Sequence, residues 1–314
     1  MAERITLTQE ALVGPWAALP VAWTDDDAFD EATYRADVAR CCAAGLPGIW
    51  AGATTGEFYA LEFEEFKAVV RATVQECRAN GKPAVIGCSD THTGGVTRRV
   101  DAAAKLGAGA IVVCLPFWLE VGDEGIAPFF KEVAAAAAGL PIIYEETLRA
   151  KKLLTVRQHQ ELKDAVPEYA AVLAGADTVA TTPAGCQTLA RLVNVLVHEE
   201  LWSILGPKGA VGSCSLMACW NPRLVLGFWR SLQNKDWIAL GIARGRIRSL
   251  LKFLELEFGT KGFTETAFAR MGARATGFLQ TSLRNRGPYR SATDAEVELF
   301  RQWCVRGYPE LLEL

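Results

Sequence analysis

Two clusters of polar residues have the types and spacing needed to bind an organic acid and move protons on it. The first is the run Gly52-Ala53-Thr54-Thr55-Gly56-Glu57, which follows an apolar stretch and offers neighbouring hydroxyls and backbone N–H groups. Such donors can bind a carboxylate, and glycine lets a ligand approach the backbone closely. Taken alone, the run is equally compatible with an ordinary loop between a strand and a helix.

The second cluster begins at Tyr144, which ends another apolar stretch, and reaches Arg149 five residues later. A phenol in this place could relay a proton, and a guanidinium could hold a carboxylate with two parallel hydrogen bonds. Glu145 and Glu146 could act as acid or base, or could only balance the charge of Arg149. Each residue also has a structural alternative, since Tyr144 could be a packing residue and Arg149 a solvated loop charge.

The elements that position these clusters are short apolar runs alternating with helix-length amphipathic runs. The apolar runs are mostly continuous, as in parallel strands buried on both faces. Glycines 45, 81 and 107 follow three of the expected helices, where a left-handed residue satisfies the last carbonyls. We expect strands at 16–23, 48–53, 83–88, 110–115, 141–144, 169–174, 201–205 and 211–216. We expect helices between them at 27–44, 62–80, 95–106, 124–138, 155–165 and 184–197.

Eight strands with intervening helices predict an α/β fold, a (β/α)₈ TIM barrel whose active site lies at the C-terminal ends of the strands. The barrel is expected over residues 1–221 and a C-terminal helical domain over 222–314. One connection is irregular, because residues 206–210 are too few to form a helix between the last two strands. Either that layer is a bare loop or one strand lies elsewhere.

Composition excludes several classes of function. The net charge of −3 over 314 residues gives no electrostatic basis for binding nucleic acid or an anionic membrane. No apolar run is long enough to span a bilayer, and there is no N-terminal signal pattern. Nine cysteines without a regular spacing favour free thiols in a reducing cytoplasm. The three histidines are far apart, so we expect no metal site, and nothing indicates a cofactor.

Taken together, the clusters resemble the dihydrodipicolinate synthase / N-acetylneuraminate lyase family, from Val13 to the C-terminal helices. Phe117-Trp118, Gly287-Pro288-Tyr289 and the long helical tail are most similar to its hydratase-aldolase branch, which handles aryl-substituted pyruvate derivatives. The motifs that carry the family resemblance, in barrel order, are Thr54-Thr55-Gly56-Glu57, Leu115-Pro116-Phe117-Trp118, Tyr144 with Arg149, and the run from Gly209 to Ser215.

The resemblance implies a lyase that acts on a pyruvate-derived 2-oxo acid by aldol cleavage, condensation or hydration. It implies that Tyr144 and Thr55 are catalytic, with Tyr144 as the proton relay and Arg149 on the distal part of the substrate. It also implies a homo-oligomer, either a dimer or a tetramer. The residues implied to bind the substrate are Thr54, Thr55, Gly56, Trp118, Arg149 and Cys214.

The sequence departs from the family where the resemblance places a Schiff-base lysine. That lysine would lie on the sixth strand, where this chain has Val172, Leu173 and Ala174. An iminium formed there is the electron sink for breaking the adjacent bond. Phe117 or Trp118 stands where the family has a second relay tyrosine, and neither can pass a proton. Other departures are Glu145 for an asparagine, and Leu148 and Ala150 for the proline and glycine that flank the arginine.

Three alternatives follow from these departures. A lysine elsewhere could form the imine, and the candidates are Lys151, Lys152 and Lys208. The chain could instead be an enzyme that works without an imine and uses Tyr144 and Glu145 as acid–base groups. It could finally be a non-catalytic homologue that retains only the ligand pocket.

Overall fold

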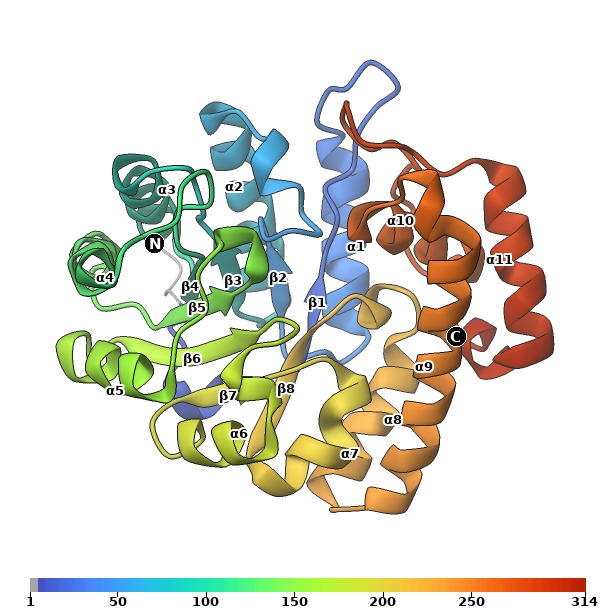
Figure 1. Ribbon diagram of the computed structural model, residues 1–314. Helices are drawn as coiled ribbons and strands as arrows, with labels where there is room; N and C mark the ends of the chain where they lie inside the picture. The colour runs from blue at the N-terminus through green and yellow to red at the C-terminus, as the bar shows by residue number, and fades with distance from the viewer. Residues whose placement is uncertain (1–4) are drawn as a thin grey trace.

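The computed structural model describes residues 5–314, and its centre is a closed barrel of eight parallel strands. Each strand pairs with its neighbours in sequence, and β8 returns to pair with β1. Helices surround the barrel, as Figure 1 shows. This confirms the expected (β/α)₈ fold. The strands are β1 (Gly14–Ala18), β2 (Ile49–Ala51), β3 (Ala84–Gly87), β4 (Ala110–Val113), β5 (Ile142–Glu146), β6 (Tyr169–Ala174), β7 (Asn194–Leu196) and β8 (Ala210–Ser215).

Five of the six helices expected in the barrel begin and end within a few residues of the expected positions. Thr155 caps α5 by accepting from the Gln158 N–H, and the Gln158 side chain accepts from Thr155 N–H in return. Pro183 opens α6, where its missing N–H costs nothing. The helices are α1 (Glu31–Ala43), α2 (Phe63–Ala79), α3 (Thr93–Leu106), α4 (Asp123–Ala137), α5 (Val156–Ala165), α6 (Pro183–Leu189), α7 (Trp202–Leu205), α8 (Pro222–Gln233), α9 (Trp237–Phe258), α10 (Glu265–Thr276) and α11 (Asp294–Gly307).

The seventh strand was expected at 201–205, and this expectation is wrong. Those residues end a 3₁₀ turn and form the short helix α7, whereas β7 is Asn194–Leu196. The expected helix at 184–197 therefore ends early, at Leu189. Alternating β-branched residues at Val193, Val195 and Val197 are typical of a strand and could have indicated this position. Helix α7 then fills part of the layer between β7 and β8, although the final connection remains short.

The barrel interior is a separate apolar cluster from the core between barrel and helices. Leu7 and Leu12, from the N-terminal segment, also belong to this interior cluster. Side chains alternate along each strand, so inward residues belong to this cluster and their neighbours pack against the helices. The inward set includes Trp16, Trp50, Val85, Val112, Ile143, Ala171, Leu196 and, toward the open end, Leu173 and Cys214.

The C-terminal helices pack directly on the barrel. Trp220 donates its indole N–H to the Ala269 carbonyl of α10 at 2.9 Å, and buried residues of α9, α10 and α11 belong to the same apolar cluster as the outer faces of the strands. Figure 1 shows α10 beside the open end near the α2 connection. The boundary at 221/222 stays a prediction. Within residues 5–314, no helix is both long and apolar enough to cross a membrane.

Candidate active site at the open end of the barrel

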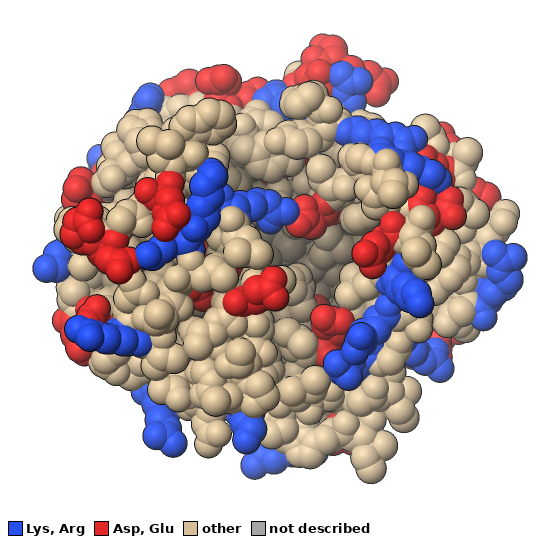
Figure 2. Space-filling model, in the orientation of Figure 1, with Lys and Arg blue, Asp and Glu red and all other residues tan. Residues whose placement is uncertain are grey.

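Two adjoining hollows lie where the C-terminal ends of the strands meet the following loops, the position expected for a barrel active site. Their volumes are about 230 and 150 Å³. In the orientation of Figure 1, the molecule is hollowed at its centre, with acidic and basic side chains around the rim (Figure 2). The residues common to both hollows are Thr54, Glu145, Thr147, Arg149 and Glu265.

The loop after β2 presents unused donors to the hollow. Thr54 and Thr55 both line it, and among the described residues neither backbone N–H has a hydrogen-bond acceptor. Gly56 is needed for the shape of this loop, because a Cβ there would lie 2.7 Å from the Gly52 nitrogen. The structure therefore brings Thr54 and Thr55 to the hollow, with Gly56 buried behind them. Free backbone N–H groups at this point suit a carboxylate.

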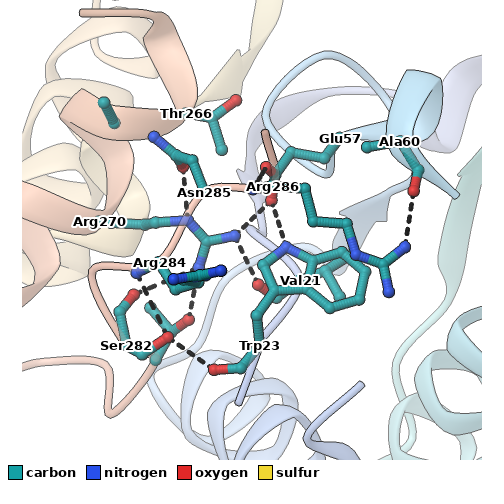
Figure 3. Close-up of polar contacts among 12 residues, drawn as sticks. Val21, Trp23, Glu57, Ala60, Thr266, Arg270, Ser282, Arg284, Asn285 and Arg286 are labelled. Atoms are coloured by element: carbon teal, nitrogen blue, oxygen red, sulfur yellow. Dashed lines mark hydrogen bonds and ion pairs between the residues drawn. The ribbon is translucent and has the colours of Figure 1, made fainter. Parts of the chain in front are cut away.

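Glu57 holds this loop in place and does not face the hollow. It is buried with a left-handed backbone (φ 50°), and its carboxylate accepts from the Trp23 indole at 2.7 Å and from buried Arg270 of α10. Arg270 also donates to Asn285 and to the Val21 carbonyl, as Figure 3 shows. A buried carboxylate needs such a complete set of partners. The clamp formed by these five residues thus fixes the loop after β2, the expected carboxylate-binding loop, to the C-terminal segment.

Glu145 is the acid–base group that the structure directs into the hollow. It is half-buried on β5 and accepts a hydrogen bond from the Thr54 hydroxyl at 3.2 Å. Burial raises the pKa of the Glu145 carboxyl, while the Thr54 hydrogen bond and the charge of Arg149 oppose that rise. A carboxyl with a raised pKa can give a proton near neutral pH and is a stronger base once ionised.

Tyr144 does not reach the hollow, which corrects its expected place at the barrel mouth. Strand alternation turns it outward, where it is fully buried against Phe130 of α4, with ring centroids 5.3 Å apart. Its hydroxyl has no hydrogen-bond partner among residues 5–314. Burial raises the pKa of Tyr144, and the nearby Glu146 carboxyl raises it further. A one-residue shift along a strand exchanges the two faces, so Glu145 takes the inward position.

Glu146 shares the outward face with Tyr144 and is likewise buried. One carboxylate oxygen accepts from the Leu154 N–H at 2.6 Å, and the other lies 3.4 Å from the His159 ring. His159 in turn contacts the Tyr169 hydroxyl at 2.8 Å. This group therefore anchors the end of the loop that carries Arg149, and Glu146 also lines the smaller hollow.

Arg149 lines the hollow and is already paired. Its guanidinium lies 2.5 Å from the Glu265 carboxylate at the first turn of α10. Burial of Glu265 disfavours its charge, but the hydrogen bond and charge of Arg149 outweigh burial and lower the pKa of Glu265. Both side chains are about half exposed, at 59% and 51%, so the pair is accessible to a ligand.

None of the three candidate lysines lines either hollow. Lys151 donates to the backbone carbonyls of Phe117 and Trp118, Lys152 pairs with Asp123, and Lys208 lies in the turn before β8. On β6 both Leu173 and Ala174 line the smaller hollow; Leu173 packs against the barrel interior, while Ala174 belongs to the outer core cluster. At the place of an imine lysine the hollow therefore presents a leucine.

The remaining expected residues divide between the hollow and the surface. Cys214 lines the hollow, and burial raises the pKa of its thiol, so the thiol is protonated. Trp118 is 75% exposed and lines neither hollow, because the loop turns it outward. Its neighbour Phe117 does line the hollow. The distal wall consists of four aromatic residues, Phe58, Tyr59, Phe117 and Tyr289.

Sequence reasoning missed Glu265 and His198, which also line the hollow. Glu265 follows Thr264 at a typical helix start, and a first-turn acid is ordinarily read as a capping feature. His198 follows β7, whose residues were expected to end a helix, so its position at a strand end was hidden. In residues 5–314 no cluster of three or more His, Cys, Asp or Glu side chains has the arrangement of a metal site.

The chain is similar to proteins of one family along nearly its whole length. The model of the dihydrodipicolinate synthetase family matches residues 11–280. A probable 5-dehydro-4-deoxyglucarate dehydratase of Streptomyces coelicolor is 33% identical, covering 98% of this chain and 95% of its own. One from Rhodococcus opacus is 32% identical, covering 68% of this chain and 70% of its own.

Solved structures show the same fold. A prophage protein of the dihydrodipicolinic acid synthase family from E. coli K12, in complex with pyruvate, superposes with a TM-score of 0.84 at 18% identity, covering 94% of this chain and 98% of its own. The dihydrodipicolinate synthase of Aquifex aeolicus gives 0.83 at 19% identity, with the same coverage. The relatives named here are synthases and dehydratases, and none is named a hydratase-aldolase. The resemblance to the hydratase-aldolase branch therefore stays a prediction. The chain belongs to the dihydrodipicolinate synthetase family, a family of lyases.

Proposed function

We propose that this protein is a carbon–oxygen lyase that removes water from, or adds it to, a 2-oxo acid without forming an imine. The observation that carries the proposal is Glu145, an inward carboxyl with a raised pKa, in a hollow lined by Leu173 and by no lysine. Dehydratase names among the relatives support elimination of water as the reaction type.

The carboxylate of the substrate would bind the free N–H groups of Thr54 and Thr55. The ionised Glu145 carboxylate would remove a proton from C3, leaving the negative charge on the 2-oxo oxygen. As that charge returns, a C3=C4 double bond forms and the C4 hydroxyl departs. Glu145 gives its proton to the departing hydroxyl, so the net change is loss of one water. Thr54, which contacts Glu145 at 3.2 Å, is placed to orient the carboxyl during both transfers.

The test uses pyruvate, the smallest 2-oxo acid with C3 protons. In D₂O the wild-type protein should exchange these protons for deuterium, as followed by proton NMR, and borohydride added with pyruvate should not stop the exchange. Glu145→Gln should slow exchange about a hundredfold or more, since proton transfer by one positioned group contributes that much. Glu257→Gln, in an exposed pair on α9 with Lys261, is the matched control and should exchange at the wild-type rate.

Two results would overturn the proposal. Borohydride inactivation with one pyruvyl mass added, and mapped by peptide mass spectrometry to Lys151, Lys152 or Lys208, would mean a relocated imine. Binding of pyruvate by calorimetry with no exchange in any variant would mean a non-catalytic ligand-binding protein.

We also propose a homo-oligomer in a reducing compartment such as the cytoplasm. All nine cysteines are unpaired thiols. Helix α9 exposes Ile238, Ile242 and Leu256, which is a large apolar contribution for one surface helix. Sedimentation equilibrium would distinguish a dimer or tetramer from a monomer.

A further inference from the structure

The hollow is lined by more acidic than basic side chains. Arg149 is the one arginine that lines the two hollows, and no lysine joins it among the described residues. Glu145 and Glu265 line both hollows, and a third glutamate, Glu146, lines the smaller one. The guanidinium best placed to recognise a second carboxylate of a substrate is therefore already paired, 2.5 Å from Glu265.

Glu265 is held in this position by two independent features. It is the first residue of α10, and Thr264 caps that helix by accepting from the Ala267 N–H. Thr266, next along the helix, donates to the Thr54 carbonyl at 3.3 Å and contacts the Tyr59 hydroxyl at 3.4 Å. The backbone that carries Glu265 is thus tied to the carboxylate-binding loop, and the positive end of the helix favours the ionised side chain.

We propose that Glu265 is a specificity-determining residue that occupies Arg149 in place of a substrate carboxylate, so that the site selects 2-oxo acids whose distal end is uncharged. This inference rests on the proposed function. An incoming distal carboxylate has to displace Glu265 and then lies beside its negative charge, where like charges a few ångströms apart repel. The aromatic wall formed by Phe58, Tyr59, Phe117 and Tyr289 instead offers apolar contact to an uncharged group.

The test compares two acids with the same carbon chain, 2-oxopentanoate and 2-oxopentanedioate, by calorimetric titration of the full-length protein at low salt. The wild type should bind the monocarboxylate at least tenfold more tightly. Glu265→Gln should tighten binding of the dicarboxylate about tenfold and leave the monocarboxylate within threefold. Adding Arg149→Met to Glu265→Gln should remove the gain, because the gain requires a free guanidinium.

Controls separate this inference from the proposed function. Glu257→Gln removes an exposed charge that lines neither hollow and should leave the tenfold preference unchanged. Glu265→Ala provides a second variant at the same exposed position, and thermal unfolding checks that each variant is folded. If the monocarboxylate binds but its preference survives Glu265→Gln, or disappears equally with Glu257→Gln, the role of Glu265 is wrong while the oxo-acid site stands. If neither acid binds any variant, both proposals are wrong.

Discussion

At the scale of single residues, the identity of the inward side chain on β6 decides which chemistry is available. Leu173 and Ala174 both line the smaller hollow, but Leu173 packs against the barrel interior whereas Ala174 belongs to the outer core cluster. Leu173→Lys should therefore place an amine among Glu145, Cys214 and the threonine loop, within reach of a bound oxo acid. We expect this variant to be trapped by pyruvate and borohydride as a single adduct at position 173, detected by intact-mass and peptide spectrometry.

The matched control is Leu173→Met, which keeps the volume and supplies no amine. It should give no adduct, like the wild type. Ala174→Lys should instead put a charge into the apolar cluster and lose stability, because an unpaired charge is costly to bury. An adduct at position 174 with none at 173 would show that the strand faces are assigned the wrong way round.

Glu145 also predicts a pH dependence of stability. Its pKa is raised in the folded protein, chiefly by burial, so the folded state binds the proton more tightly than the unfolded chain does. This carboxyl therefore favours folding fully at pH values below its unfolded pKa, and that contribution is lost as pH rises through the folded value. Glu145→Gln lacks this titration.

The free energy of unfolding of Glu145→Gln, relative to that of the wild type, should thus increase as pH rises from about 4 to about 8. Urea unfolding at several pH values measures the difference. Glu257→Gln serves as the exposed control and should show no such gain. If the free energy of unfolding of Glu145→Gln relative to the wild type is constant, or decreases, as pH rises, the raised pKa of Glu145 is contradicted.

The sequence placed the threonine loop and Arg149 just after strand ends, where both line the hollow, and their roles stay predictions. It misassigned Tyr144 because the short apolar run expected as the strand, 141–144, has no polar alternation that would fix which face each residue takes. Glu265 could not be predicted, because its contact with Arg149 joins residues 116 positions apart. Nothing local in the sequence indicates that contact.

At the scale of elements, α10 carries much of the site although it lies outside the barrel. Its residues reach the hollow through Glu265, the threonine loop through Thr266 and the buried clamp through Arg270. The sequence predicted that residues 222–314 are helical, and this helix, Glu265–Thr276, lies within them. It did not predict the role, since the buried partners Glu57 and Arg270 each look like ordinary surface charges in a linear sequence.

The close packing of α10 can be tested at Gly272. A Cβ at this position would lie 2.1 Å from the ring of Trp220, which is itself buried. Helix propensity alone predicts that Gly272→Ala gains roughly 0.5–1 kcal/mol. We expect the opposite, a loss of about 1–3 kcal/mol, because overpacking displaces the indole. Urea unfolding of the variant gives the sign.

Gly245→Ala is the matched control for this substitution. Gly245 lies in the interior of α9, is exposed, and has open space around its Cβ position. Here the helix-propensity gain of roughly 0.5–1 kcal/mol should appear unopposed. If Gly272→Ala stabilises the protein as Gly245→Ala does, α10 is not packed against Trp220 as the structure has it.

At the scale of the whole molecule, the barrel and the C-terminal helices share one apolar core. The outer faces of the strands, α1–α5 and the buried residues of α9, α10 and α11 form a single cluster. Asn221 lies at the expected boundary, where it caps α8 and donates to the carbonyls of Glu310, Leu311 and Glu313. The sequence placed a division at this residue because strand patterns stop there. Composition could not show that residues 1–221 and 222–314 bury their apolar side chains against each other.

We therefore expect residues 1–221 to be unable to fold alone, in contrast to a barrel that merely carries an appended domain. Removing 222–314 exposes Trp220, which packs against Phe300 and Gly272, and leaves Glu57 buried without Arg270, a loss of about 3–5 kcal/mol for that pair alone. The full chain should lose its near-UV and far-UV circular dichroism in one coincident thermal transition. The truncated chain should show no cooperative transition and little near-UV signal. A sharp transition in the truncated chain would mean that residues 1–221 fold without the clamp and α10. The inference that the site depends on the C-terminal segment would then be wrong.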